Sequence, residues 1–297
     1  MKLLTQYQTF ADAQSHCNKQ ALWALFDGQP EHFNIAHECV DRHRHAQTPA
    51  IILTHTDAED EVLGFDELSR LSSQFAHYFL QQGVQAGDRV AIMLEPSKTF
   101  YGAIFGVMKM GAIAVPMFTL FGLEGVRLRV QDCQPKLMLT HPSQTHAVQG
   151  IAGLQVVWDT PELTRALVQL PDVFECHTRA QDLAIFQYTS GTTRELPEAV
   201  KHTHGALVTL MIAALYGTGI RPGERFYCPS SPAWGHGLWH GTLAPLALGV
   251  TIGAYAGKFK PERMLQSLSQ HRFNNLSAAA THYRMMRTSG AAHLHAY

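Results

Sequence analysis

The chain has 297 residues, about two domains' worth, and its hydrophobic fraction of 46% excludes a disordered or coiled-coil protein. Charged residues make up 16%, and 23 basic against 24 acidic side chains give a net charge of −1. Because there is no basic surplus to neutralise a phosphate backbone, nucleic-acid binding is disfavoured.

Apolar residues alternate along the chain between helical spacing and continuous runs of strand length. The first clear pair is a helix over 65–82, with Gly83 as its C-cap, and a strand over 89–94. The uninterrupted apolar run of that strand is typical of a strand buried on both faces. Regular alternation predicts an α/β fold, with mostly parallel βαβ sheets and helices on both faces. The next elements predicted are helices at 98–110, 123–132 and 142–149 and strands at 112–117, 136–140, 154–158 and 183–188.

One stretch, 101–122, is apolar enough to suggest a membrane span. Lys109 lies in its middle and Pro116 near its end, so we interpret it as a buried helix followed by a buried strand. The N-terminus shows no secretory signal. The five cysteines are odd in number and include no C-x-x-C pair, a pattern that fits a reducing cytoplasm and argues against a disulfide scaffold or zinc ribbon.

A segment at about 160–181 contains two prolines and interrupts the alternation. We therefore expect a helical lead-in over 1–30, a first α/β subdomain over 31–180 and a second one over 181–297. The final segment, Ser289–Tyr297, follows the last helix without a cap or a further strand. The second subdomain is predicted to contain helices near 203–216, 238–248, 261–271 and 281–288 and strands near 225–228, 250–255 and 274–279.

The segment Tyr188–Val200 places four Ser and Thr hydroxyls around Gly191, directly after an apolar strand. Open α/β sheets bind ligands at this edge, and a glycine lets the backbone approach an anion. The segment is not a Walker A loop, because no G-K-[ST] closes it, nor a G-x-S-x-G elbow, because Ser190 lacks the leading glycine. The residues alone leave two readings open: a phosphate-binding loop, or a connection that caps the helix near 203 through Thr203.

A second glycine-rich segment, Pro229–Gly241, contains Trp234, His236 and Trp239. Glycines permit close approach of a substrate chain, and an indole offers a flat apolar wall, so the segment is a candidate pocket lining. The alternative is an aromatic cluster that only packs the domain. The spacing of the histidines does not indicate a zinc site. Three histidines are interpreted as ordinary polar surface or cap residues: His202, His204 and His240.

Tyr188-Thr-Ser-Gly-Thr-Thr193 resembles the nucleotide-phosphate loop of the AMP-forming acyl-CoA synthetases, the acyl-adenylate-forming superfamily of AMP-dependent synthetases and ligases. That superfamily includes acyl- and aryl-CoA ligases, peptide-synthetase adenylation domains and luciferases. The likeness runs from about residue 30 to 288. Further segments that resemble the acetyl- and medium-chain-acyl-CoA synthetase branch, in the same order, are Phe33–His43, Gly64–Leu68, Gly87–Ile92, Gly111–Met117 and Thr281–Met286.

The resemblance implies a ligase of fatty acid metabolism that joins a carboxylic acid to coenzyme A with ATP and Mg²⁺, through an acyl-AMP intermediate. A tryptophan-lined pocket admits short, medium or aromatic acids. The resemblance assigns the departing β- and γ-phosphates to Thr189, Ser190, Gly191, Thr192 and Thr193. It assigns the acyl pocket to Trp234, Gly235, His236 and Gly237.

The loop departs from the family pattern, which continues with glycine, any residue and Pro-Lys-Gly. Here Arg194 begins a longer connection, and Glu198 stands in place of a lysine and would repel triphosphate. The guanidinium of Arg194 could restore the positive charge with a bidentate fork, and Lys201 is close in sequence. A solvated surface arginine is the alternative. We interpret the segment as a variant phosphate loop, with Arg194 among its phosphate ligands.

Several motifs of complete family members are absent from these 297 residues. They are a Tyr-Gly-x-Thr-Glu segment, a Thr-Gly-Asp that grips the ribose, and a C-terminal lid domain with the catalytic lysine. We therefore expect a truncated, largely inactive N-terminal fragment with no assigned catalytic residue, whose exposed sheet edges need the missing C-terminal half or a partner chain. Two alternatives are a non-catalytic module that binds nucleotide, an acyl group or a protein, and one half of a split enzyme.

Overall fold

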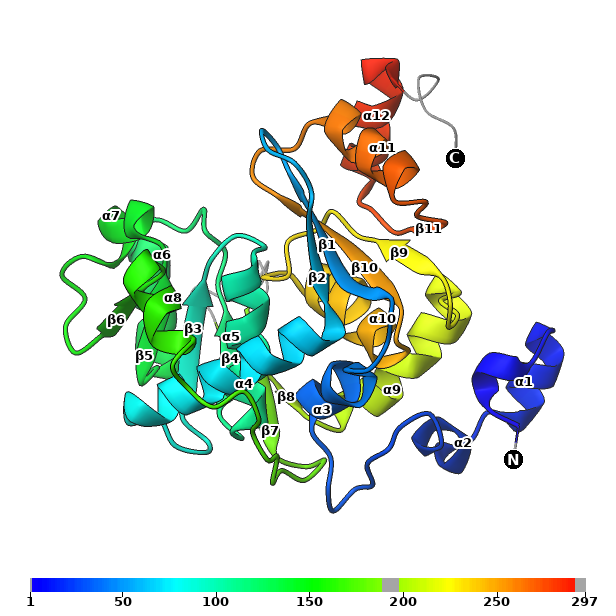
Figure 1. Cartoon of the computed structure of the whole chain (residues 1–297), viewed down its shortest axis with the longest axis horizontal. Coiled ribbons are helices and arrows are strands. Elements are labelled where there is room, and N and C mark those ends of the chain that lie inside the picture. Colours follow the sequence, from blue (N-terminus) through cyan, green and yellow to red (C-terminus); the bar gives the residue numbers. More distant parts are fainter. Residues whose placement is uncertain (1, 189–197, 292–297) are drawn as a thin grey trace.

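The computed structural model describes residues 2–188 and 198–291. In these ranges the chain forms two sheets (Figure 1). The six-stranded sheet has the order β6-β5-β3-β4-β7-β8, from Gln155–Trp158, Leu137–Thr140, Arg89–Met93, Ile113–Pro116, Leu183–Gln187 and Val200–Thr203. The five-stranded sheet has the order β11-β9-β10-β1-β2, from Asn275–Leu276, Arg225–Tyr227, Thr251–Ala256, Pro49–His55 and Glu61–Gly64.

Each sheet is parallel except for one outer strand. β2 pairs with β1 and β8 pairs with β7 in antiparallel fashion, and all other pairs are parallel. The predicted α/β class with mostly parallel sheets is therefore confirmed. The helices are α1 (Phe10–His16), α2 (Lys19–Trp23), α3 (Ile35–Cys39), α4 (Phe65–Gln81), α5 (Lys98–Lys109), α6 (Leu123–Cys133), α7 (Thr145–Val148), α8 (Pro161–Leu167), α9 (Ala206–Ala213), α10 (Ala244–Ala247), α11 (Pro261–Gln270) and α12 (Ala280–Ser289).

Three hydrophobic cores define the layers. The central core lies between the sheets and includes α4 and α5, whereas the outer cores lie under α6 and α7 on one side and under α11 and α12 on the other (Figure 1). Strand β3 shows why its sequence is continuously apolar. Val90 and Ile92 face the central core, and Ala91 and Met93 face the outer one.

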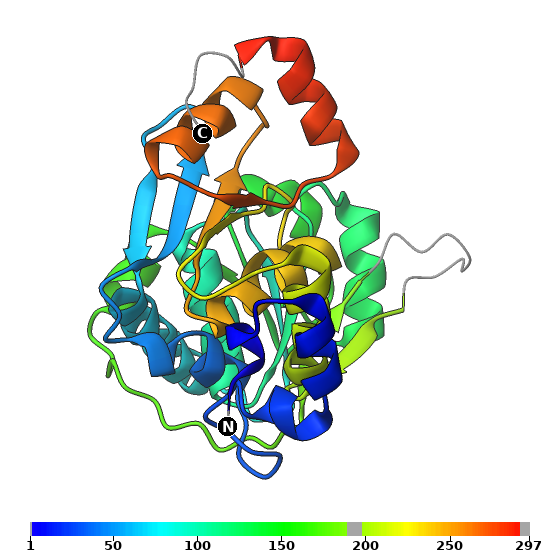
Figure 2. The same ribbon diagram turned by 90° about the vertical axis from the view of Figure 1, so that its right-hand side faces the viewer.

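The expected helical lead-in contains α1 and α2, which pack beside the helical segment 206–218 (Figure 2). α2 contacts α9, and the Phe10 ring lies 6.0 Å from that of Tyr216. The subdomain boundary at residue 180 stays a prediction. β1 and β2 complete the sheet of β9–β11, while β7 and β8 complete the sheet of β3–β6.

The apolar stretch 101–122 forms most of α5 and all of β4, as expected. Across the described ranges no helix is both long and apolar enough to cross a membrane.

Several predicted elements need correction. The segment 160–181 contains the short helix α8, whose Leu163 and Leu167 are buried. The helix expected at 238–248 begins as a π-helix, η5 (His236–Leu243), before α10. Thr203 does not cap a helix, since it ends β8, and α9 starts at Ala206 without a side-chain cap before continuing into the π-helix η4 (Ala214–Thr218).

His204 was interpreted as a surface or cap residue, and that interpretation is wrong. The side chain is fully buried, and its Nδ1 accepts a hydrogen bond from the Ile35 N–H at 3.0 Å. Burial lowers the pKa of His204 to about 4. His43 also has its pKa lowered to about 4, first by burial and then by the charge of Arg42. Both imidazoles are therefore neutral in the folded protein at pH 7.

The buried imidazole of His204 makes folding stability pH-dependent. Because the folded pKa is near 4 and the ordinary value is 6.5, the stabilisation is complete above pH 6.5 and is lost as the pH falls toward 4. Between pH 7 and pH 5, His204 alone should remove about 2 kcal/mol from the free energy of unfolding. In urea unfolding at these two pH values, His204→Asn should show a smaller loss than the wild type.

His141→Asn is the matched control, because exposed His141 also accepts a backbone N–H through Nδ1, from Ser143. That variant should keep the wild-type pH dependence. Equal pH dependence in His204→Asn and the wild type would contradict the assignment.

Candidate functional site

The predicted acyl segment Pro229–Gly241 joins the carboxyl edges of the two sheets. It follows β9 in the five-stranded sheet, and it contacts residues that end β7 and follow β4 in the six-stranded sheet. The Gln187 side-chain amide donates a hydrogen bond to the Ala233 carbonyl, and the Trp234 ring lies 5.7 Å from the ring of Phe118. Ligands of open α/β sheets bind at this edge.

The predicted phosphate ligands lie outside the described residues, so their roles stay predictions. They are Thr189, Ser190, Gly191, Thr192, Thr193 and Arg194. The residues that flank them are described. Gln187 pairs with Val200 across β7 and β8, so the segment leaves and re-enters the sheet at neighbouring positions. Downstream of the segment, Glu198 is exposed, and the Lys201 ammonium lies 5.4 Å from the centre of the Phe186 ring.

The two tryptophans of the acyl segment have different surroundings. Trp234 is 37% exposed, and its one aromatic neighbour among the described residues is Phe118, at a tilted angle. Trp239 is buried and packs on His202 at 4.7 Å. Trp234 is therefore available to contact a ligand, whereas Trp239 contributes to the core.

His236 is held by hydroxyls from two strands of the five-stranded sheet. Nδ1 lies 3.0 Å from the Ser230 hydroxyl after β9, and Nε2 lies 2.9 Å from the Ser277 hydroxyl after β11. Burial lowers the pKa of His236 from its ordinary value. The neutral ring can accept one hydrogen bond and donate another, so it ties the ends of β9 and β11 together.

Sequence reasoning missed three residues that this edge brings together: Phe118, Gln187 and Ser277. No local motif marks them. The position of Phe118 directly after the predicted strand 112–117, and of Ser277 within the one at 274–279, is the signal that could have found them.

Glycine is required at Gly237 but not at Gly235. A Cβ at Gly237 would lie 2.2 Å from the Ser231 carbonyl oxygen and 2.4 Å from that of Ser230, whereas one at Gly235 would meet nothing within 4 Å. Gly237 therefore lets the first turn of η5 pack onto the backbone that follows β9.

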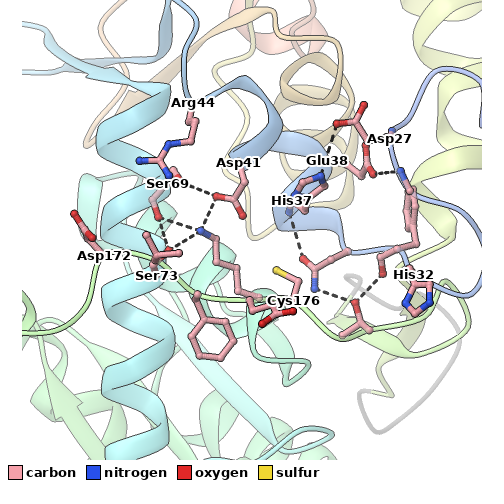
Figure 3. Close-up of a pocket in the computed structure, with 18 residues that line it drawn as sticks. Asp27, His32, His37, Glu38, Asp41, Arg44, Ser69, Ser73, Asp172 and Cys176 are labelled. Carbon is pink, nitrogen blue, oxygen red and sulfur yellow. Dashed lines mark hydrogen bonds and ion pairs between the residues drawn. The ribbon is translucent and has the colours of Figure 1, made fainter.

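The described residues also form a hollow of about 590 Å³ on the opposite edge (Figure 3). Lys109 is the last residue of α5, next to the edge at which β4 begins, and it lines the wall of the hollow. The ammonium donates to Asp41 Oδ1 at 2.6 Å, the Ser69 carbonyl at 3.0 Å and the Ser73 hydroxyl at 2.9 Å. Since its three donors are used within the protein, the Lys109 ammonium is not free to bind an anion in this hollow.

Gly237→Ala should destabilise the protein by about 1–3 kcal/mol or more, because the new methyl group meets rigid backbone oxygens. Gly235→Ala, two residues away in the same segment, should change the free energy of unfolding by less than about 0.5 kcal/mol. Urea unfolding of the two variants measures the difference. Equal stabilities would contradict the packing described for η5.

Comparisons with known proteins agree with this architecture. The AMP-binding enzyme family model matches residues 40–297. The acetyl-coenzyme A synthetase of Bacillus subtilis (strain 168) is 27% identical over 273 residues, which are 86% of this chain and 48% of the relative. The 3-hydroxybenzoate–CoA ligase of Aromatoleum sp. (strain CIB) is 28% identical over 239 residues, or 76% of this chain and 45% of the relative.

Among solved structures, an acyl-CoA synthetase of Brucella canis matches with a TM-score of 0.88 and 23% identity, over 96% of this chain and 54% of that one. An anthranilate CoA ligase in complex with anthranoyl-AMP matches with a TM-score of 0.76 and 20% identity, over 90% of this chain and 53% of that one. The chain spans about half the length of these proteins. The predicted resemblance to AMP-forming acyl-CoA synthetases is confirmed, and the chain belongs to the AMP-binding enzyme family.

Proposed function

We propose that this chain carries the triphosphate-binding and acyl-binding portion of an AMP-forming carboxylate–CoA ligase. The observation that carries the proposal is that one family match, over residues 40–297, contains both the predicted phosphate loop and the acyl segment. The hydrogen bond from Gln187 to Ala233 supports it, because it joins the strand that leads into the loop to the segment that holds Trp234.

In the proposed reaction, a carboxylate oxygen of the acid attacks the α-phosphorus of ATP and pyrophosphate leaves, which gives acyl-AMP. The thiol of coenzyme A then attacks the acyl carbon, and AMP leaves. The hydroxyls and N–H groups of residues 189–193 would stabilise the charge that builds up on the departing phosphates, with Arg194 as the cation. Trp234 and Phe118 would hold the acyl group beside the α-phosphorus.

The substrate class that fits the aromatic wall of Trp234 and Phe118 is a small aliphatic or aromatic carboxylic acid. The relatives are named for acetyl, 3-hydroxybenzoate and anthranilate groups. Trp234 and Phe118 offer neighbouring aromatic surfaces. Coenzyme A would be the second substrate.

A magnesium ion is implied by the family, and its ligands in the described part of the chain stay unassigned. No three His, Cys, Asp or Glu side chains come together as metal ligands there. Because Mg²⁺ usually keeps several waters and binds through one or two carboxylates together with substrate phosphates, we propose that it binds with the triphosphate of ATP.

A polypeptide of these 297 residues should bind ATP and yet catalyse little acyl transfer. The sequence contains neither the ribose-gripping Thr-Gly-Asp nor the lysine expected of complete family members. Loss of even one such transition-state stabiliser typically costs about 10²–10³ in rate. The remaining groups would come from another segment or another chain.

Titration calorimetry with Mg-ATP, combined with a pyrophosphate-exchange assay on several carboxylates, tests the proposal. We expect heat of ATP binding and no exchange. Ser190→Ala/Thr192→Val should weaken ATP binding about tenfold or more, because two donors to a charged group are lost. Ser143→Ala/Thr145→Val, an exposed pair with the same spacing after β5, should bind ATP as the wild type does.

Absence of ATP binding, or equal affinity in the Ser190 and Ser143 double variants, would contradict the phosphate-loop assignment. Clear exchange by the pure protein would contradict the expectation of an incomplete site. Exchange that appears only when a second polypeptide is added would identify the chain as half of a split enzyme.

A further inference from the structure

One carboxylate contacts the chain on both sides of the predicted phosphate segment. Asp132 Oδ2, near the end of α6, accepts a hydrogen bond from the Tyr188 hydroxyl at 2.6 Å and from the Ala199 N–H at 3.2 Å. Tyr188 is the last described residue before the segment 189–197, and Ala199 follows it by two positions. Residues 67 and 56 positions away from Asp132 are thereby fixed to a single oxygen atom.

The Tyr188 ring packs against the last turn of α6. The Arg129 guanidinium lies 3.7 Å from the centre of the Phe121 ring and 5.3 Å from that of Tyr188, and its Nη1 donates to the Gly125 carbonyl at 2.8 Å. Gln134 then ends the helix in the left-handed conformation, with φ of 45°. The tyrosine ring is thus packed against α6, and its hydroxyl reaches the Asp132 carboxylate.

The protonation state of the Tyr188 phenol favours this contact. Burial, followed by the hydrogen bond to Asp132, raises the pKa of Tyr188. The phenol therefore remains a donor throughout the physiological pH range.

The contact adds to what the sheet already provides. Among the described residues, the β7–β8 pairing ends at Gln187 and Val200, and no backbone hydrogen bond joins Tyr188 to Ala199. Asp132 is the described group that holds both of them. Fixing the ends of a loop lowers the conformational entropy that is lost when the loop orders around a ligand.

We propose that Asp132 is a positioning residue for nucleotide binding, which braces the two ends of the phosphate segment without touching the phosphates itself. The role of the segment rests on the proposed function, whereas the brace rests on the geometry of Asp132, Tyr188 and Ala199 alone.

Three variants separate the brace from general stability. Asp132→Leu keeps the side-chain size and removes the acceptor, whereas Asp132→Asn keeps an oxygen that can accept from both donors. Tyr188→Phe removes the contacts of the hydroxyl with Asp132 and with the Arg129 carbonyl, and it keeps the packed ring. Asp88→Leu is the control, since Asp88 accepts a single backbone N–H, from Gln85 at 2.9 Å, at the opposite edge of the sheet.

Two readouts are needed on the full chain. Hydrogen exchange followed by mass spectrometry should show faster exchange in peptides that cover 187–200 in Asp132→Leu and, to a lesser extent, in Tyr188→Phe. Asp132→Asn and Asp88→Leu should exchange in that region as the wild type does. By calorimetry, Asp132→Leu should bind Mg-ATP about tenfold more weakly, and Asp132→Asn should restore affinity to within about threefold of the wild type.

The two readouts test two different claims: hydrogen exchange tests the brace, and ATP binding tests the positioning role. Unchanged exchange over 187–200 in both Asp132→Leu and Tyr188→Phe would overturn the brace, whether or not ATP binds. Faster exchange with wild-type ATP affinity in Asp132→Leu would overturn the positioning role. If the wild type binds no ATP, the proposed function and the positioning role fail together, and the exchange data still decide whether the brace exists.

Discussion

The close contact between α4 and α5 is the constraint on which the two-sheet arrangement depends. A Cβ at Gly106 would lie 2.6 Å from the Phe75 Cβ, so the helices can approach this closely only because α5 carries glycine there. One turn further along α5, the Lys109 ammonium is buried, and removing this charge from water costs free energy. Asp41 and two groups of α4 offset that cost, because together they accept one hydrogen bond from each of the three donors of the ammonium. Both sheets pack against this helix layer, so the pair joins them through one central core.

The candidate site lies where segments from the two sheets meet. The acyl segment leaves the five-stranded sheet after β9 and reaches the six-stranded sheet through the side chain of Gln187, while His236 secures the start of η5 to the ends of β9 and β11. Gly237 allows the tight return of this segment onto the backbone. On the other side of β7, Asp132 fixes the ends of the predicted phosphate segment. Triphosphate and acyl group would thus be held by separate segments that meet at one edge.

The sequence predicts the parts of this fold whose signal is local. Strands buried on both faces, such as β3, are visible as continuous apolar runs, and α4 is visible from its helical spacing. The hairpin of β1 and β2 escapes such reasoning because its partner is distant: Ile51 pairs with Ile252. The polar edge strand β8 has no apolar run that would predict it. The surface interpretation of His204 failed because the contact that buries this residue, with Ile35, joins positions far apart in sequence. In the site, Trp234 and Gly237 are recognisable from their motif, but the role of Asp132 depends on contacts between residues far apart in sequence.

Competition binding among ATP, inorganic pyrophosphate and AMP tests the central claim most directly. If this chain supplies the grip on the β- and γ-phosphates and not the grip on the ribose, pyrophosphate should displace ATP from the pure protein, and AMP should displace it poorly. The reverse order, with AMP displacing ATP and pyrophosphate having no effect, would show that the nucleotide is held by its adenosine part and would contradict the account.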